Sequence, residues 1–362
     1  MQIRLPFHYD VEIFSECFTF YKLGMMKSHR DYEDWLFNHG GIFMNEAYNT
    51  YWGRQGQRLR MEDYAPLLEF TPIDRNAFSS GEELLAAIVR ILSDGEYVML
   101  EQGFENGDPL DPEPLRIHET VFYAVDTEKR TVCHPCLGNG FFIEREESFE
   151  EIVEAHKRML TYYDEHEYFA RQVKETHFAF NRVRVCHEAR ERADMQRFFH
   201  MLEQDFASGL TTTTYYDLEW KQERSYHYRG SSEVLRGYRE WLDSRTRGEQ
   251  KERMWIRLSL GLFKYREYVA LLRRKVDILR RAGMPYDDEP LEKLQRILEN
   301  LRYQALRWEQ TGRDEAIPDL CEALDRAFAA DRYFLLDLLY HLRTFLIQPT
   351  LSNINPFCLN RN

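Results

Sequence analysis

A change of pattern near residue 165 constrains the fold of this chain more than any other feature. Residues 1–165 alternate short helical and strand-like runs and hold most of the glycine and proline, whereas the remainder is charged and periodic at helical spacing. A length of 362 residues corresponds to about two domains. The pattern therefore predicts an α+β domain over residues 1–165, an all-helical domain over residues 166–350 and an irregular tail over residues 351–362.

Charge and composition exclude several classes of function. The net charge of −13 opposes the counterion release that drives nucleic-acid binding. No run approaches the roughly 18–20 apolar residues of a membrane span, and the first residues lack the basic-then-apolar order of a signal peptide. Six cysteines in so long a chain are too few for a disulfide scaffold. We expect a soluble cytoplasmic protein with free thiols that binds neither nucleic acid nor membranes.

Three helix starts and several strands can be placed in the first part of the chain. Ser15 is expected to cap a helix that runs through Met25, with Gly24 weakening its end. Capping boxes at Ser80–Glu83 and Ser148–Glu151 predict two further helices. Strands are expected at residues 97–101 and 141–143, and a hairpin is expected from residues 117–125 and 130–133 around a turn at 126–129.

The second part predicts at least five helices with mostly solvated charged faces. Pro290 suits the first turn of one of them, and Gly312 suits its end. These helices are expected at about residues 166–208, 231–245, 250–282, 288–310 and 314–347.

Cys17 is the cysteine whose local setting best suits a nucleophile. It would lie in the first turn of its helix, where unpaired N–H groups and the positive end of the helix dipole favour a thiolate. Glu16 beside it carries a negative charge, which opposes the thiolate. A cysteine in an apolar helix is also a common packing residue, so the catalytic interpretation requires a base nearby.

His118 is the candidate base. It heads an apolar strand directly after a long loop, so its side chain could face a cleft while the strand fixes its position. A third group should orient the imidazole. Asp126 is assigned to the turn, whereas the return strand is expected to bring His134 beside His118. We therefore predict Cys17, His118 and His134 as the catalytic residues.

Cys133 and Cys136 form a Cys-x-x-Cys pair with several interpretations. The motif is expected at the end of a strand and directly before turn sequence. In redox-active pairs, by contrast, the first cysteine lies at a helix N-terminus. No second pair completes a zinc site, although Cys17 or His118 could add a ligand. We expect packing or cleft lining rather than a redox or metal site.

The order of these parts resembles papain-clan cysteine proteins. The resemblance is carried by the cysteine at the start of a helix, the Glu-Leu-Leu-Ala-Ala-Ile-Val helix at 83–89, the Gly-x-Tyr-Val strand at 95–98, and His118 followed by Asp126 and a charged turn. More closely, residues 7–160 are similar to the butirosin biosynthesis protein H group, which includes relatives encoded beside nonribosomal peptide synthetases in bacilli. Residues 215–242 and the helix expected at 253–279 are more loosely similar to the helical C-terminal portion of that group.

The resemblance implies a papain-like fold for the first domain, with Cys17 as nucleophile and His118 as base. It also implies a reaction in which an acyl group moves from a carrier protein onto an amine. This sequence departs from the group at His134, where an aspartate is expected, and before Cys17, where Ser15 and Glu16 replace the usual His-Cys pair.

Residues 251–285 form a basic segment within the acidic chain. They contain ten lysines and arginines against three acidic residues, a net +7 that leaves −20 for the rest. One interpretation is a solvated helix that pairs with acidic neighbours such as Glu289 and Glu292. The other is a docking face for an acidic carrier protein and its phosphopantetheine phosphate. The second interpretation assigns partner binding to Arg273, Arg274 and Lys275.

We therefore expect an acyltransferase of bacterial natural-product biosynthesis. Cys17 would take the acyl group from the thioester of an acyl or peptidyl carrier protein. It would then pass the group to a small-molecule amine acceptor. The protein would need no cofactor of its own, because the phosphopantetheine belongs to the carrier protein. Two alternatives stay open: a papain-like peptidase or amidase would use the same Cys17 and His118, and a noncatalytic partner of a biosynthetic assembly would need neither.

Overall fold

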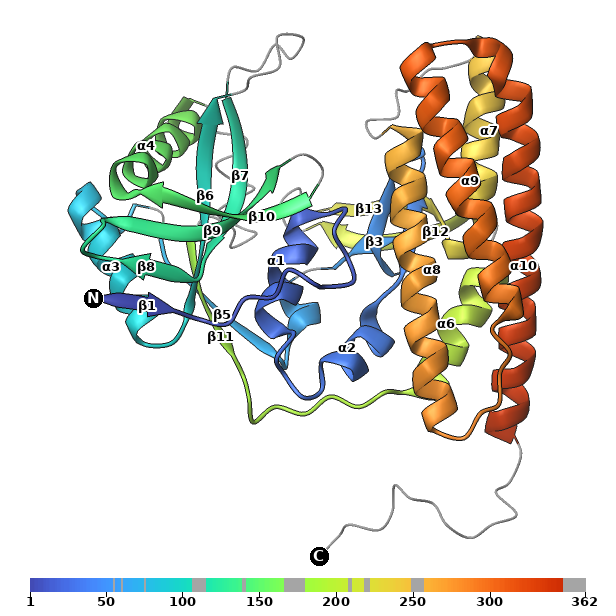
Figure 1. Ribbon diagram of the computed structural model, residues 1–362, viewed down its shortest axis with the longest axis horizontal. Helices are drawn as coiled ribbons and strands as arrows, with labels where there is room; N and C mark the ends of the chain where they lie inside the picture. The colour runs from blue at the N-terminus through green and yellow to red at the C-terminus, as the bar shows by residue number, and fades with distance from the viewer. Residues whose placement is uncertain are drawn as a thin grey trace, which may run out of the picture. The chain divides into compact units, whose positions relative to one another are not determined.

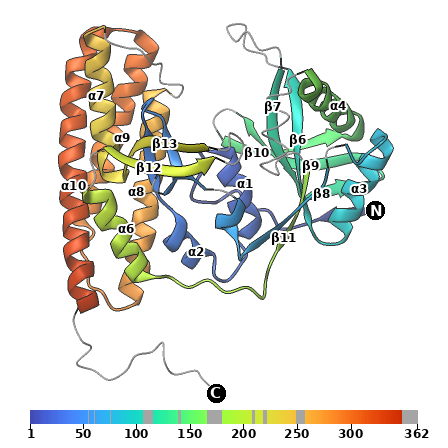
Figure 2. The ribbon, with the colours of Figure 1, turned by 180° about the vertical axis from the view of Figure 1, so that it is seen from behind.

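The computed structural model describes residues 1–54, 56–59, 61–74, 76–105, 115–138, 141–165, 180–207, 210–217, 222–248 and 257–347. The chain is a mixed α+β protein with small antiparallel sheets and a helical C-terminal region. It forms two compact units, whose elements are labelled in Figures 1 and 2. Unit 1 comprises Met1–Tyr32, Leu59–Glu191 and Tyr216–Gln222, and unit 2 comprises Glu33–Arg58, Arg192–Tyr215 and Glu223–Asn362.

Unit 1 is built on two four-stranded antiparallel sheets. The first sheet has the strand order β1 (Gln2–Arg4), β8 (Ala124–Asp126), β9 (Thr131–Gly138) and β10 (Phe141–Ser148). The second has the order β5 (Leu68–Pro72), β11 (Phe180–Val185), β6 (Tyr97–Glu105) and β7 (Leu115–Phe122). Its helices are α1 (Cys17–Met26), η1 (Met61–Tyr64), α3 (Gly81–Ser93) and α4 (Phe149–Glu165).

Helices α3 and α4 begin at the two capping boxes that the sequence predicts. Ser80 Oγ accepts a hydrogen bond from the Glu83 amide at 3.2 Å, while the Glu83 carboxylate accepts one from the Ser79 amide at 2.8 Å. At α4 the exchange is reciprocal, because the Glu151 amide donates to Ser148 Oγ at 3.2 Å and the Ser148 amide donates to Glu151 at 2.8 Å. These bonds satisfy N–H groups that a helix start otherwise leaves unpaired.

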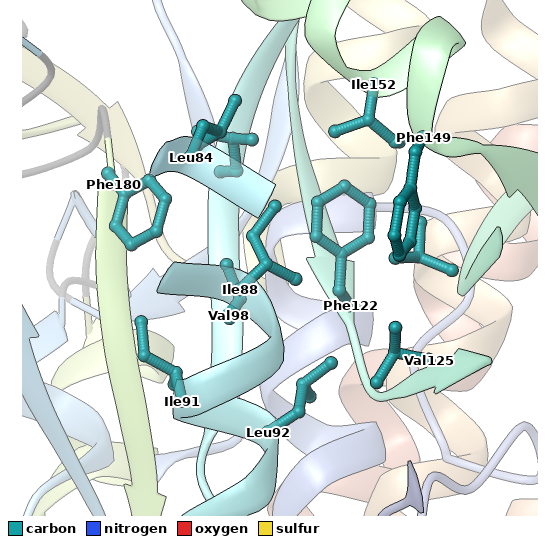
Figure 3. Close-up of a cluster of buried hydrophobic side chains, with 12 residues drawn as sticks. Leu84, Ile88, Ile91, Leu92, Val98, Phe122, Val125, Phe149, Ile152 and Phe180 are labelled. Atoms are coloured by element: carbon teal, nitrogen blue, oxygen red, sulfur yellow. The ribbon is translucent and has the colours of Figure 1, made fainter. Parts of the chain in front are cut away.

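The core of unit 1 lies where the apolar faces of α3 and α4 meet the two sheets (Figure 3). The predicted stripe on α3 faces inward, with Leu84, Ile88 and Leu92 fully buried. Burial of each such side chain stabilises the fold by about 1.5–3 kcal/mol relative to exposure. The cluster contains Leu84, Ile88, Ile91, Leu92, Val98, Leu100, Phe122, Val125, Val132, Phe149, Ile152 and Phe180.

Unit 2 combines a helical bundle with a five-stranded sheet. The sheet order is β12 (Leu210–Asp217), β13 (Gln222–Arg229), β2 (Ile42–Asn45), β3 (Thr50–Arg54) and β4 (Gln57–Arg58). Helices α7, α8, α9 and α10 run side by side in Figure 1. Within the described ranges, no helix combines the length and apolar character needed to cross a membrane. The helices are α2 (Tyr32–His39), α6 (Met195–Ala207), η2 (Ser231–Glu233), α7 (Val234–Thr246), α8 (Leu258–Arg281), α9 (Glu289–Thr311), η3 (Asp314–Ala316) and α10 (Ile317–Ile347).

Two buried lysines tie α8 to the segment that carries β2 and β3. Lys264 Nζ donates to the Thr50 carbonyl at 3.1 Å, and Lys275 Nζ donates to the Gly40 carbonyl at 2.6 Å. Lys275 also lies 4.8 Å from the centre of the Phe198 ring, a cation–π distance. The lysine heads are thus bound within unit 2 rather than presented to a partner.

The two units do not divide at the single point near residue 165 that the sequence predicts. Residues 33–58 belong to unit 2, because β2 pairs with β13. Conversely, β11 belongs to unit 1, because it lies between β5 and β6. Chain-local periodicity carries no information about such pairings.

The sequence pattern predicts that the second part of the chain is all-helical, but the structure contains strands there. The helix expected at 166–208 is in fact β11 followed by α6, while residues 166–179 lie outside the described ranges. Strands β12 and β13 also interrupt the helices, in a stretch rich in the threonine and tyrosine that favour strands. The other four helices and the ends of α9 are confirmed, with Pro290 in the first turn and Gly312 in the left-handed conformation at φ 63°. The expected tail over residues 351–362 lies outside the described ranges.

Candidate active site

Cys17 is the first residue of α1, and its thiol is half-buried. Glu16, rather than Ser15, occupies the N-cap in an extended conformation, and its side chain makes no capping hydrogen bond. The sequence prediction of a Ser15 cap is therefore wrong by one residue. The thiol nevertheless lies in the first turn, where the N-terminal amides and the helix dipole stabilise negative charge.

Gly24 sets how closely α1 approaches the segment before it. The helix continues through Gly24 to Met26 instead of weakening there. A Cβ atom at this position would lie 2.5 Å from Cζ of Phe7. The Phe7 ring in turn stacks on Tyr123, with ring centres 4.9 Å apart. A larger residue would have to displace this ring stack, so the glycine positions the helix that carries Cys17.

Cys17 and His118 form a hydrogen-bonded pair across unit 1. The Sγ atom of Cys17 lies 2.9 Å from Nε2 of His118, although the two residues are 101 apart in the chain. The hydrogen bond to Cys17 raises the pKa of His118 to about 9, and burial only partly opposes this. A pair of this kind exchanges a proton within one hydrogen bond, so the site can produce a thiolate with a protonated imidazole beside it.

Glu119 orients the imidazole through its main chain. The carbonyl oxygen of Glu119 lies 2.6 Å from Nδ1 of His118. A carbonyl can only accept, so Nδ1 must carry a proton, and in the neutral ring Nε2 is left as the acceptor facing the thiol. The group that orients the imidazole is therefore a backbone carbonyl of the strand itself.

The side chain of Glu119 forms a buried ion pair with Lys22. Lys22 Nζ lies 3.0 and 3.4 Å from the two carboxylate oxygens, and the lysine side chain has 0% exposed surface. Burial lowers the pKa of Lys22 and raises the pKa of Glu119, while each group partly offsets the shift of the other. The sequence did not indicate this pair, because a lysine in a helix is usually solvated.

Aromatic rings enclose the buried side of the pair. Tyr21 meets the imidazole of His118 edge-on, with ring centres 6.4 Å apart and planes at 79°. Phe142 on β10 contacts Tyr21 and stacks on Phe20 with ring centres 3.8 Å apart. These contacts fix α1 against β10 and limit the rotamers open to His118.

His134 does not lie beside His118, contrary to the sequence prediction. Strand β9 pairs with β8 and β10, and the residue across from His134 in the ladder is Arg145. His134 is buried and its Nε2 lies 3.4 Å from the carboxylate of Glu147. The expected hairpin exists, but its return strand pairs with residues 124–126 rather than with the start of β7.

Gln102 is another residue at this site that the sequence does not indicate. It lies directly across from His118 in the β6–β7 ladder, and its side chain is 0% exposed. Within the described ranges, neither its amide nitrogen nor its amide oxygen has a hydrogen-bond partner. The strand expected from the sequence ends at Glu101, whereas β6 continues through Gln102 to Glu105. A longer predicted strand would have been needed to identify Gln102 as a neighbour of His118.

The Cys-x-x-Cys pair lies on β9, where residues three apart point to opposite faces. Cys133 is buried with its sulfur 3.6 Å from a guanidinium nitrogen of Arg4, whereas Cys136 is half-buried and lies opposite Ile143 in the ladder. Such side chains cannot share one metal ion or form one disulfide without a change of backbone. Among the described residues, no group of three or more His, Cys, Asp and Glu side chains is arranged to hold a metal ion.

Arg273, Arg274 and Lys275 do not form a single exposed basic face. Lys275 is buried, so its assignment to partner binding is wrong, because its ammonium is bound to Gly40 inside unit 2. Arg273 lies 3.9 Å from Glu292, as the solvated-helix interpretation expects, and Arg274 is exposed. All three line a pocket of about 340 Å³ in unit 2, together with Glu33, Leu36, Phe37, Ala270, Leu271, Asp277, Ile278 and Arg281.

Neither a protein-family model nor a curated protein matches the chain. The resemblance to the butirosin group therefore rests on the residues quoted for it, and the function is argued from the site itself.

Proposed function

We propose that this chain is a cysteine-dependent acyltransferase of bacterial natural-product biosynthesis, with a papain-like domain that carries the reaction. The observation that carries the proposal is the 2.9 Å contact between Cys17 Sγ and His118 Nε2. A nucleophile within hydrogen-bond reach of a base, with the base oriented by a third group, is the arrangement that covalent acyl transfer requires. The position of Cys17 at a helix N-terminus and the fixed Nδ1 of His118 support the same role.

In the first half of the reaction, the Cys17 thiolate attacks the carbonyl carbon of a thioester. The developing oxyanion would be stabilised by the backbone N–H groups at the start of α1. The carbon–sulfur bond to the phosphopantetheine arm then breaks, and the departing thiolate takes the proton from Nε2 of His118. The acyl group remains on Cys17 as a thioester.

In the second half, an amine attacks the acyl-enzyme. His118 is now neutral and its Nε2 accepts the proton that the amine loses. The bond between the acyl carbon and Cys17 breaks, which releases an amide and returns the thiolate. The amine is a small molecule in this proposal, and water in its place would make the enzyme a hydrolase.

The donor in this proposal is a phosphopantetheine thioester on an acyl or peptidyl carrier protein. Carrier proteins of this kind present acidic surfaces, which basic side chains attract. On α8, Arg273 and Arg274 both line the pocket of unit 2 described above, and Arg274 is exposed. These two residues remain the proposed docking residues. Lys275 is not part of this surface.

Intact-mass analysis after addition of an acyl N-acetylcysteamine thioester tests the proposal. We expect a mass gain of one acyl group on the wild type and on Cys136→Ala, which removes another half-buried thiol, and no gain on Cys17→Ala. Addition of a small amine should then remove the acyl group as an amide. The absence of any gain on a wild type whose Cys17 reacts with iodoacetamide would favour the noncatalytic role instead.

The same assay separates acyl transfer from peptidase or amidase activity. A peptidase would form its acyl-enzyme from peptide substrates. It would release a carboxylate, because water hydrolyses the acyl-enzyme. Acylation by the carrier thioester, with amide as the product, would favour the acyltransferase. Acylation by peptides alone would favour the peptidase.

A further inference from the structure

Two pairs of side chains connect the same two elements of unit 1. Cys17 and Lys22 both belong to α1, while His118 and Glu119 are consecutive residues of β7. The thiol–imidazole contact and the lysine–carboxylate contact thus both connect the helix to the strand, although the side chains of consecutive strand residues leave opposite faces of β7. The buried ion pair is part of the surroundings of the catalytic pair rather than a separate feature of the core.

The charges of these four groups alternate in sign once Cys17 has passed its proton to His118. The thiolate of Cys17 favours the charged form of Lys22, and protonated His118 favours the charged form of Glu119. Electrostatic interaction is reciprocal, so Lys22 favours the thiolate and Glu119 favours the imidazolium. Burial of Lys22 and Glu119 strengthens both effects, while solvent partly screens the effect on His118, whose side chain is exposed.

We propose that Lys22 and Glu119 are positioning residues that hold the Cys17–His118 pair in its charged, hydrogen-bonded form. Glu119 acts twice, because its carbonyl fixes Nδ1 of His118 while its carboxylate binds Lys22. Lys22 acts by placing a cation on the helix that carries the thiol. The inference rests on the proposed function for the role of Cys17 as nucleophile, but not on the identity of the substrate.

Other groups around Lys22 do not replace this pairing. Its ammonium lies 3.2 Å from the centre of the Phe18 ring and 6.0 Å from that of Tyr64, which adds cation–π stabilisation. Glu16 is a further acidic group that favours the charged lysine. Burial raises the pKa of Tyr21 and of Tyr64 well above the usual range, so these phenols stay neutral.

The test is the pH dependence of Cys17 alkylation in the double variant Lys22→Met, Glu119→Gln. Both charges are removed together, because a single change would leave one buried charge without its partner and could prevent folding. The Glu119 carbonyl is retained. Iodoacetamide labelling is followed on the peptide that contains Cys17, and the near-UV circular dichroism spectrum checks the fold.

We expect the ratio of the labelling rate at about pH 6.5 to that at about pH 9.5 to fall at least tenfold in the double variant. A tenfold fall corresponds to a shift of about one pH unit in the formation of the reactive pair. A folded double variant whose ratio stays within about twofold of the wild type would overturn the proposal.

A second ion pair, at the C-terminal end of α1, supplies the control. Lys27 Nζ lies 3.0 Å from the carboxylate of Glu12, and both side chains are largely buried. The variant Lys27→Met, Glu12→Gln should leave the labelling ratio unchanged. An equal fall in this variant would show that the loss of any ion pair next to α1 is enough, and would also overturn the proposal.

Alkylation requires no substrate, so this test separates the inference from the proposed function. If the labelling ratio falls as expected but no thioester acylates the wild type, acyl transfer fails and the role of Lys22 and Glu119 stands. If thioesters acylate Cys17 and the ratio does not change, acyl transfer stands and this inference fails.

Discussion

Nδ1 of His118 lies 2.6 Å from the main-chain oxygen of Glu119, the next residue on the same strand. A hydrogen bond between consecutive residues survives substitution of the Glu119 side chain, so the tautomer of the imidazole is determined by the backbone of β7. A separate aspartate is therefore not needed to orient the ring. The backbone carbonyl carries no full charge, however, which leaves the stabilisation of an imidazolium to the thiolate and to the Glu119 carboxylate.

The first prediction concerns the titration of His118. Because the hydrogen bond to Cys17 is the main cause that raises the pKa of His118 to about 9, the variant Cys17→Ala should lower it toward the ordinary value of about 6.5. An NMR titration of the His118 ring proton measures this directly. A pKa that stays near 9 in Cys17→Ala would show that the thiol is not the partner of the ring.

The same shift predicts how stability depends on pH. A pKa of about 9 in the folded state lies above the value of about 6.5 for an unfolded histidine, so protonated His118 stabilises the fold fully below about pH 6.5. This contribution is lost as the pH rises through 9. The advantage of wild type over Cys17→Ala in urea unfolding should therefore be larger at about pH 6 than at about pH 9.5, and an equal advantage at both would contradict the assignment.

The third prediction separates His134 from the reaction. His134→Gln should leave Cys17 alkylation unchanged, because the buried imidazole faces Glu147 rather than His118. Stability should fall by about 1–3 kcal/mol, because the buried Glu147 carboxylate loses a polar neighbour while Arg145 still holds it at 3.0 Å. Labelling kinetics and urea unfolding measure the two effects, and a large loss of Cys17 reactivity in a folded variant would return His134 to the site.

Features that depend on neighbours in the chain could be predicted from the sequence. The capping boxes were found because a serine and a glutamate three residues later make their hydrogen bonds locally. The turn at Asp126 follows the same logic, with its carboxylate accepting from the amides of Glu128 and Lys129 at 3.0 and 3.1 Å. Cys17 and His118 can be selected as candidates from the sequence because a helix start and a strand start are also local features.

Features that depend on strand pairing could not be predicted in the same way. The partner of His118 in the ladder is Gln102, because β7 pairs along its length with β6 and only the following strand pairs with β9. Lys22 was missed for a related reason. Its burial depends on Glu119, which lies 97 residues away in the chain.

The fourth prediction tests the docking surface on α8. Arg274→Glu should weaken binding of a phosphopantetheine-bearing carrier protein, with a loss that is greatest at low salt, because an exposed charge is screened as ionic strength rises. Lys275→Met should instead lower the stability of unit 2, since the Gly40 carbonyl loses its buried donor. Titration calorimetry and thermal unfolding separate the two, and unchanged binding by a folded Arg274→Glu variant would remove this surface from the proposal.

The last prediction concerns Asp331, a carboxyl group on α10 with 0% exposure. Burial raises its pKa to about 7, with Glu233 adding to the shift and Tyr265 and Arg332 only partly offsetting it. The folded-state value lies above the ordinary value of about 3.9, so the stability associated with the protonated carboxyl is complete below about pH 4 and is lost as the pH rises through 7. At pH 8 the fold must therefore hold a buried, ionised carboxylate.

Asp331→Asn keeps the shape of the side chain and removes the charge. We expect the variant to be more stable than the wild type by about 2–4 kcal/mol at pH 8, and nearly equal to it at about pH 4. Urea unfolding at the two pH values measures this. Asp325→Asn is the control on the same helix, because Asp325 is 63% exposed and pairs with Arg239 at 3.3 Å. A gain for Asp331→Asn that is the same at both pH values would show that the wild-type carboxyl does not titrate in this range.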